Sequence, residues 1–200
     1  MEKGLFLTFS GVDGCGKTSV AKALVERIRA SGDKAVFVDL NTTPFGAATK
    51  RLIMETDDMS PEVEVGLFQA ALQYNYDHII KPAVDKGINV IHDRWIIDTY
   101  VYQKILKNSS IEPHMNVEDP DLCFILDLPV EIARERIEMR DEETNRFDDM
   151  DMKSHINIRK GFITMGNLLN NKANSRFIIL DASKSIEAIV EAVYKLIGGE

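Results

Sequence analysis

The segment GVDGCGKT at residues 11–18 limits the possible folds of this chain more than any other part of its sequence. It matches the P-loop pattern GxxxxGK[ST], whose glycines let backbone N–H groups turn toward phosphate oxygens. The apolar run at 5–9 before it predicts a buried strand, and the apolar spacing at 18–29 after it predicts a helix. A strand, a glycine loop and a helix in this order indicate a nucleoside-triphosphate site, although the loop alone does not identify a second substrate.

The residue types in the loop suit ATP and Mg2+. The N-terminus of the following helix adds partial positive charge beside the phosphates. We expect Lys17 to bridge the β- and γ-phosphates and Thr18 to offer its hydroxyl to Mg2+. Cys15 is predicted to fill a variable position, and with Cys123 it makes neither a disulfide framework nor a metal cluster. The predicted ATP contacts in the loop are Gly11, Gly14, Cys15, Gly16, Lys17, Thr18 and Ser19.

Short apolar runs alternate with helical patterns along the chain. Further strands are predicted at 35–40, 88–92, 122–126 and 176–180, and helices at 44–54, 60–80, 96–106, 129–139, 151–169 and 185–197. This alternation predicts right-handed crossovers and a parallel sheet covered on both faces. We therefore expect a three-layer α/β sandwich of the P-loop NTPase class, with five parallel strands, in a single domain at 1–200. The polar segment 140–151 is predicted to be a lid.

Composition argues against several classes of function. The chain has 200 residues and a net charge of −8, so its composition does not indicate a basic surface that would bind nucleic acid. No apolar run reaches the length of a membrane span, and the first residues lack a signal-peptide pattern. We expect a cytoplasmic enzyme whose partners are small nucleotides and not nucleic acid or membrane.

Charged residues follow several predicted strands, at the edge where open α/β sheets bind ligands. Asp93 and Arg94 come directly after the strand at 88–92. An aspartate there can hold Mg2+ through water, and an arginine can grip an acceptor phosphate with two N–H groups. An Asp–Arg pair that caps a helix is the alternative. Four arginines are expected around the lid, where they would stabilise charge on the transferring phosphoryl group. They are Arg134, Arg136, Arg140 and Arg146.

The order and spacing of these motifs resemble the thymidylate kinase family over nearly the whole chain. The family's GxDGxGKT loop stands here at 11–18, its TPxG segment at 43–46 and its DRY-type motif as Asp93-Arg94-Trp95. The family's stacking phenylalanine is Phe68 here, and its AYQ segment is Val101-Tyr102-Gln103. Its LDLP segment is Leu126-Asp127-Leu128-Pro129, its lid RF is Arg146-Phe147, and its DAS segment is Asp181-Ala182-Ser183. The resemblance implies a homodimeric nucleoside monophosphate kinase that uses ATP and Mg2+ to convert dTMP to dTDP.

The resemblance also implies roles for single residues. Arg136 would lie on the adenine of ATP, beside Ala182. Because Cys15 is not basic, the cation that stabilises the transition state would come from the lid, with Arg140 and Arg146 as candidates. The implied acceptor contacts are Asp13 at the sugar 3′-hydroxyl, Arg94 with Lys50 or Arg51 at the phosphate, Phe68 on the base and Tyr102 against the sugar.

Two departures from the family bear on the acceptor base. The family's REPGG stretch is VDLNT here, at 38–42, and its aspartate–arginine pair after the stacking phenylalanine is Ala71 and Leu72. In the family that arginine helps to read the thymine edge. Without it, the base could be read by Gln69, Gln73 or Thr99, or the acceptor could carry another base.

Two other functions remain open from the sequence. A deoxynucleoside kinase would share the fold and would need a carboxylate base near the 5′-hydroxyl, for which Asp39 and Asp98 are candidates. Asp98 also replaces a usual serine and adds negative charge near the acceptor. A nucleotide-dependent switch is a different class, disfavoured because the sequence lacks the guanine-reading NKxD motif. Apart from the resemblance, an aromatic residue on an apolar helical face, such as Phe68, is more often a core residue than a binding residue, and Tyr102 has the same ambiguity.

Overall fold

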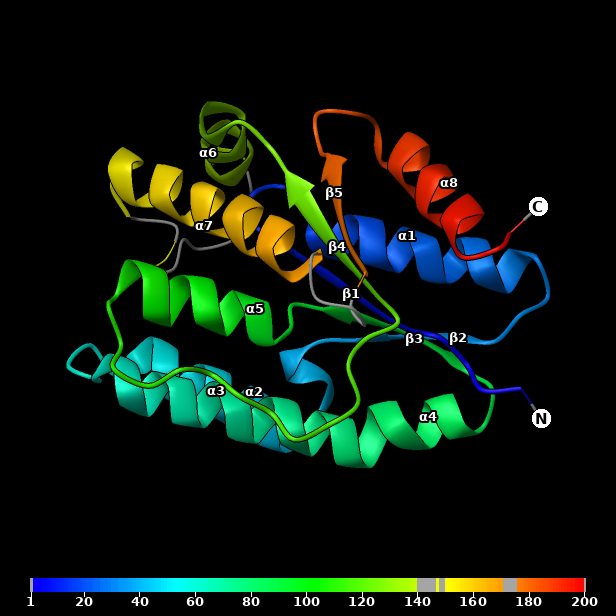
Figure 1. Cartoon of the computed structure of the whole chain (residues 1–200), viewed down its shortest axis with the longest axis horizontal. Helices are drawn as coiled ribbons and strands as arrows, with labels where there is room; N and C mark the ends of the chain where they lie inside the picture. The colour runs from blue at the N-terminus through cyan, green and yellow to red at the C-terminus, as the bar shows by residue number, and fades with distance from the viewer. Residues whose placement is uncertain (1, 140–146, 148–149, 171–175, 200) are drawn as a thin grey trace.

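The computed structural model in Figure 1 describes residues 2–139, 147, 150–170 and 176–199 of the chain. Within this part, five parallel strands form one sheet in the order β2-β3-β1-β4-β5, which confirms the predicted architecture. β1 is central and buried along its whole length, so the loop after it leaves the middle of the sheet edge. The strands are β1 Phe6–Gly11, β2 Ala35–Val38, β3 Asn89–Asp93, β4 Leu122–Asp127 and β5 Arg176–Asp181.

Helices cover both faces of the sheet (Figure 1). On one face α1 (Lys17–Ala30) packs against α8 (Ile186–Leu196), and on the other α7 (Met152–Asn170) lies against β4 and β5. The remaining helices are α2 Pro44–Glu55, α3 Pro61–Asn75, α4 Lys81–Asp85, α5 Ile96–Thr99 and α6 Val130–Glu138, with a 3-10 turn at Leu40–Thr42. In the described part of the chain, no helix has the length and apolarity needed to cross a membrane.

Two predicted helices change geometry partway along. The sequence predicts continuous helices at 60–80 and 96–106, but α3 passes into a π-helical turn at Tyr76–Ile80, and α5 passes into a π-helical segment at Tyr100–Leu106. Apolar spacing does not separate these geometries, because i→i+5 bonding widens a turn by only one residue. The second π-helical segment carries Tyr102 and Gln103, so it sets the positions of both side chains.

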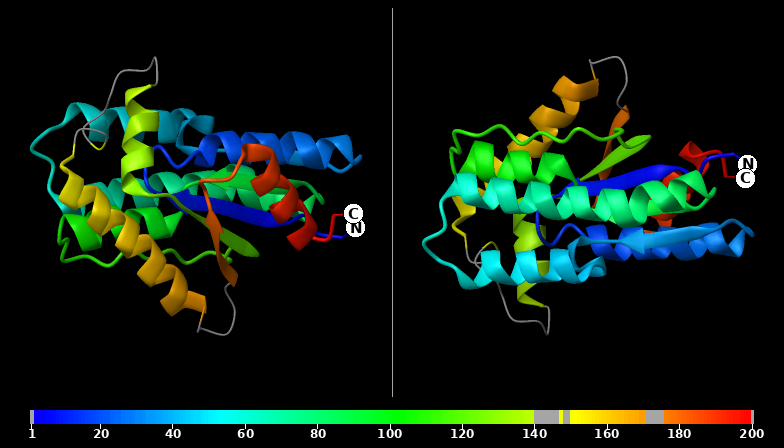
Figure 2. Two further views of the ribbon diagram at one scale, coloured as in Figure 1. Left: turned by 90° about the horizontal axis from the view of Figure 1, so that it is seen from above. Right: turned by 90° about the horizontal axis from the view of Figure 1, so that it is seen from below.

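The starts of α2 and α3 follow local sequence rules. Thr43 Oγ1 accepts a hydrogen bond from the Gly46 backbone N–H at 3.1 Å, and Ser60 Oγ accepts one from the Val63 N–H at 3.4 Å. A proline follows each cap in the first helical turn, where its missing N–H removes no helical bond. Figure 2 shows the two helices, which pack against each other, running side by side.

Gly14 and Gly16 have φ angles of 82° and 94°, in the left-handed region. A β-carbon at Gly14 would lie 2.2 Å from the Ala133 carbonyl oxygen, whereas one at Gly16 would meet nothing within 4 Å. We expect Gly16→Ala to lower the free energy of unfolding by about 1–2 kcal/mol through backbone strain. Gly14→Ala should lower it by about 3 kcal/mol or more, because it also forces two backbone segments apart. Urea denaturation measures both, and equal losses would contradict this prediction.

Candidate active site

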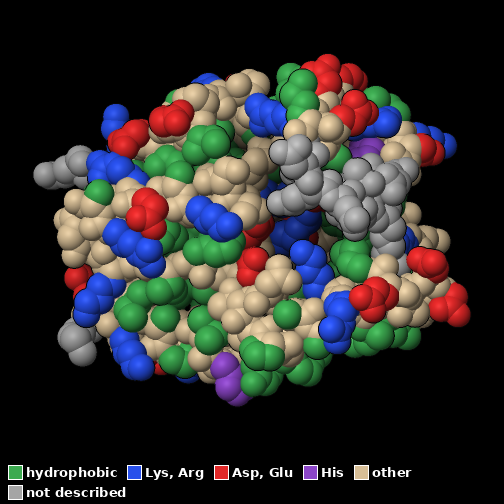
Figure 3. Space-filling view, turned by 180° about the vertical axis from the view of Figure 1, so that it is seen from behind, with side chains coloured by type: hydrophobic (Ala, Val, Ile, Leu, Met, Phe, Trp, Pro, Cys, Tyr) green, Lys and Arg blue, Asp and Glu red, His purple; other side chains and the backbone are tan. Residues whose placement is uncertain are grey.

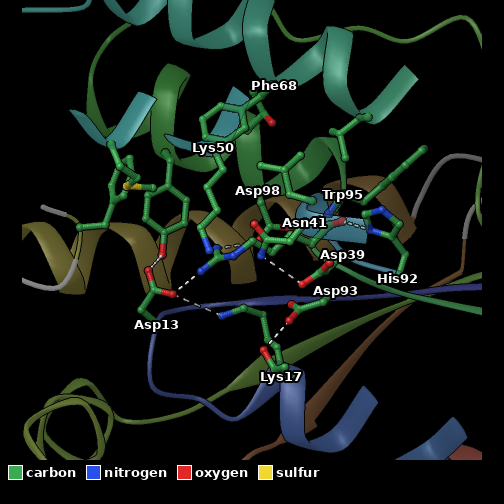
Figure 4. A pocket seen from close by; sticks show the side chains of 18 of the residues that line it. Asp13, Lys17, Asp39, Asn41, Lys50, Phe68, His92, Asp93, Trp95 and Asp98 are labelled. Atoms are coloured by element: carbon green, nitrogen blue, oxygen red, sulfur yellow. Dashed lines mark hydrogen bonds and ion pairs between the residues drawn. The ribbon is translucent and has the colours of Figure 1, made fainter. Parts of the chain in front are cut away.

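A cavity of about 400 Å³ lies at the carboxyl ends of β1 and β3. Figure 4 shows Asp13, Lys17 and Asp93 on one side of it, with Lys50 and Phe68 reaching in from the other. On the face turned away in Figure 1, charged side chains of both signs gather in a hollow (Figure 3). Six residues predicted to contact the acceptor line the cavity, namely Asp13, Lys50, Phe68, Arg94, Thr99 and Tyr102.

The P-loop presents a helix N-terminus and a buried ammonium group. Gly16 is the N-cap of α1, whose first turn holds no acidic residue, so its partial positive charge is available to an anion. Lys17 Nζ donates to the carbonyl oxygens of Gly11 at 2.9 Å and Val12 at 2.8 Å. Burial raises the pKa of the Cys15 thiol, which disfavours its thiolate. The loop therefore offers one cation and several N–H groups to phosphates.

Thr18 and Asp93 place two oxygens beside the P-loop. The Thr18 hydroxyl donates to Asp93 Oδ2. Asp93 Oδ1 is buried and has no hydrogen-bond partner among the described residues. Magnesium takes oxygen ligands and usually keeps several waters, with one or two protein ligands beside substrate phosphates. The orphaned carboxylate oxygen and the neighbouring hydroxyl fit such an ion.

Arg94 is held between two aspartates at the end of β3. One guanidinium nitrogen contacts Asp13 and another lies 3.2 Å from Asp98 Oδ1. Burial disfavours the charge, but these carboxylates outweigh it and raise the pKa of Arg94 well above its usual value. Tyr102 completes the group by donating its hydroxyl to Asp13 Oδ2 at 2.9 Å. Arg94 therefore carries a permanent positive charge into the cavity.

Two carboxylates suggested as general bases are engaged within the protein. Asp98 Oδ2 accepts from Ser10 Oγ at 2.6 Å and from the Trp95 backbone N–H at 3.0 Å, while Oδ1 faces Arg94. Burial raises the pKa of Asp98, and Arg94 partly offsets this rise. Asp39 Oδ1 accepts from Thr42 Oγ1 at 3.0 Å in its own turn. The negative charge that replaces the family's serine is thus paired with Arg94 instead of facing the cavity alone.

Only one of the two cations considered for the acceptor phosphate lines the cavity. Lys50 and Arg51 are neighbours on α2, and Lys50 reaches into the cavity while Arg51 is exposed outside it. Adjacent residues lie about 100° apart around an α-helix, so Lys50 and Arg51 point in different directions from α2.

The residues predicted at the adenine of ATP also come together. The Arg136 guanidinium of α6 lies 3.4 Å from the carbonyl oxygen of Ala182. The Ala182 N–H in turn donates to the Asp127 carbonyl at 2.8 Å, which ties this turn to the end of β4. Arg140 and Arg146, the predicted lid cations, lie outside the described residues.

Sequence reasoning misplaced part of the base-reading group. Gln69 donates to the His114 carbonyl and Gln73 donates to Asp77 at 2.9 Å, so both are directed away from the cavity lining. Thr99 lines the cavity, and so does Gln103, which had no predicted role. The sequence did contain a signal for this residue. Gln103 is the last residue of the AYQ match, and it follows Thr99 by four positions, a spacing that places both on one face of the predicted helix at 96–106.

An ion pair near the P-loop also escaped the sequence analysis. Arg159 of α7 contacts both carboxylate oxygens of Asp127, at 2.6 and 2.9 Å. Asp127 ends β4, the strand that pairs with β1. This bidentate contact ties α7 to the strand end beside the P-loop. The two residues are 32 positions apart, and no local pattern pairs them.

Comparison with known proteins gives a consistent result. The family model for thymidylate kinase matches residues 9–193. Thymidylate kinase of Ruegeria pomeroyi is 30% identical over 203 residues, covering 97% of this chain and 94% of the relative. Thymidylate kinase of Dinoroseobacter shibae is 30% identical over 193 residues, covering 92% of this chain and 91% of the relative.

Proposed function

The chain belongs to the thymidylate kinase family, and on this premise we propose that it transfers the γ-phosphate of ATP to dTMP, giving ADP and dTDP. The observation that supports this best is one cavity in which the P-loop lies opposite Lys50 and Phe68, and Arg94 also lines this cavity. A deoxynucleoside kinase is not favoured, because Arg94 and Lys50 suit an acceptor that already carries a phosphate.

The proposed chemistry is a direct transfer without a covalent intermediate. An oxygen of the acceptor phosphate attacks the γ-phosphorus while the bond to ADP breaks, and positioning and charge stabilise this loose transition state. Lys17 would exchange the loop carbonyls for β- and γ-phosphate oxygens. Thr18 and Asp93 would hold Mg2+, which supplies neutralising charge to the phosphates. Arg94 and Lys50 would hold the acceptor phosphate in line.

The acceptor sugar and base would meet the opposite wall of the cavity. Asp13 would accept a hydrogen bond from the 3′-hydroxyl, while Tyr102 would pack against the sugar and disfavour a 2′-hydroxyl. Phe68 would stack on the base. Leu72 lines the cavity at the position where the family has an arginine. We therefore propose that the Gln103 carbonyl oxygen accepts a hydrogen bond from the edge of the base instead.

The donor side would be completed by residues around the lid. Arg136 and Ala182 would contact the adenine. Arg140 or Arg146 would supply the lid cation that stabilises charge on the transferring phosphoryl group. A lid that closes over the phosphates would also exclude water and suppress wasteful ATP hydrolysis.

We also propose that the chain acts as one domain and assembles as a homodimer. Phe45 and Leu52 of α2 and Val63 and Tyr74 of α3 are apolar or aromatic side chains left exposed on neighbouring helices. The Phe45 and Tyr74 rings stack with centroids 5.0 Å apart, which makes a continuous aromatic surface across the two helices. A second copy of the chain is the proposed occupant of this surface.

An acceptor panel tests the proposed activity. The purified protein with ATP and Mg2+ is offered dTMP, dUMP, dCMP, dGMP or thymidine, and ADP release is followed. We expect dTMP to give the highest kcat/KM and thymidine to give no stimulation of ADP release. Arg94 and Lys50 would bind the acceptor through its phosphate group, which thymidine lacks.

The other outcomes of the panel identify the alternatives. Stimulation by thymidine alone would indicate a deoxynucleoside kinase. If no acceptor increased ADP release, the nucleotide-dependent switch would be favoured.

A further inference from the structure

A buried carboxylate lies directly behind the acceptor side of the cavity. Glu64 of α3 is 0% exposed, and its Oε2 accepts a hydrogen bond from the Gln103 amide nitrogen at 2.8 Å. The Lys107 ammonium lies 2.8 and 2.7 Å from the two carboxylate oxygens. Only the carboxylate of this pair is fully buried, since the Lys107 side chain is 27% exposed, and the desolvation of Glu64 offsets much of the attraction between them. The pair therefore calls for a role besides holding the two helical segments together.

The carboxylate determines which way the Gln103 amide faces. An ionised carboxylate accepts hydrogen bonds and cannot donate them, so Gln103 must turn its NH2 group toward Glu64. The carbonyl oxygen is then directed away from Glu64. It is buried and has no hydrogen-bond partner in the described part of the chain. Because Gln103 lines the cavity with Phe68 and Thr99, a base stacked on Phe68 can supply the missing donor.

We infer that Glu64 is a positioning residue for acceptor choice: it locks the Gln103 carbonyl toward the base, so that the pocket selects bases with an N–H donor at that edge. The inference rests on the proposed function. Thymine and uracil carry a hydrogen at N3, whereas cytosine has a bare acceptor nitrogen there. Facing cytosine, the Gln103 amide cannot flip to offer its NH2 group, because Glu64 holds that group. Lys107 balances the charge of the buried carboxylate.

Glu64→Gln tests the lock, because a carboxamide both donates and accepts and thus permits either orientation of Gln103. We expect kcat/KM for dTMP relative to dCMP to fall about 10- to 100-fold, with the KM for ATP unchanged. Lys107→Gln is the matched control. It removes the same ion pair but keeps the carboxyl group of Glu64, to which the new amide and Gln103 can both donate. Its dTMP/dCMP ratio should stay within about threefold of the unmodified protein.

Each remaining outcome counts against the inference. An unchanged ratio in Glu64→Gln would overturn it, and so would an equal fall in both variants, since that would show a role in packing alone. Should Glu64→Gln not fold, Gln103→Met removes the carbonyl at similar volume and must weaken use of dTMP while sparing dCMP. An equal loss on both substrates would overturn the lock. An unmodified protein that does not phosphorylate dTMP would contradict the proposed function first, and this inference with it.

Discussion

Lys17→Met is expected to lower kcat for dTMP phosphorylation by about 10³-fold. The substitution keeps a long unbranched side chain but removes the ammonium that the P-loop holds beside the phosphate site. That ammonium is buried and belongs to the loop itself, where it donates to Gly11 and Val12. A neutral side chain would leave the charge that develops between the β- and γ-phosphates without its nearest protein cation. Steady-state kinetics at saturating ATP and dTMP measure the loss.

Stability and a second lysine serve as controls for this substitution. Lys17→Met leaves two loop carbonyls without a donor, so we expect the free energy of unfolding to fall by about 1–3 kcal/mol. Lys22→Met removes an exposed cation on the same helix, outside the cavity, that lies over the Phe37 ring. It should leave kcat unchanged. A Lys17→Met enzyme that kept more than about a tenth of the normal kcat would be incompatible with the assigned role.

The fold follows from the sequence because its determinants are local. Each strand is a short apolar run that ends within a few residues of a polar or glycine signal, as at Gly11 and Asp93. The caps at Thr43 and Ser60 act within their own helical turns. Strand and helix alternation then leaves few topologies, since parallel crossovers have a fixed hand. The P-loop follows β1 directly, so its place at the sheet edge could also be predicted.

The contacts within the site could not be predicted in the same way. Asp13 and Arg94 meet although they are 81 positions apart, and no local pattern specifies that Asp98 lies on the other side of the guanidinium. The choice of Lys50 over Arg51 depends on the exact phase of α2. The orientation of Gln103 depends on a π-helical segment and on Glu64 from another helix, and apolar periodicity reports neither.

Arg94→Ala is expected to lower kcat/KM for dTMP by about 10³-fold or more while changing the affinity for ATP much less. The guanidinium holds Asp13 and Asp98 apart as a counter-ion to both. Without it, two carboxylates would face the incoming acceptor phosphate, so repulsion would add to the lost bidentate contact. Arg94 has a φ of 71°, and alanine keeps a β-carbon there, so the substitution tests the charge and not the backbone strain.

Two further variants separate the charge effect from general damage to the site. Arg94→Ala combined with Asp98→Asn should recover part of the lost kcat/KM, because it removes one of the two carboxylates that Arg94 no longer pairs with. Arg51→Ala, which removes an exposed cation outside the cavity, should behave as the unmodified protein. Isothermal titration with a non-hydrolysable ATP analogue reports the donor side independently. If Arg94→Ala weakened ATP and dTMP binding equally, Arg94 would belong to the framework of the site and not to the acceptor phosphate.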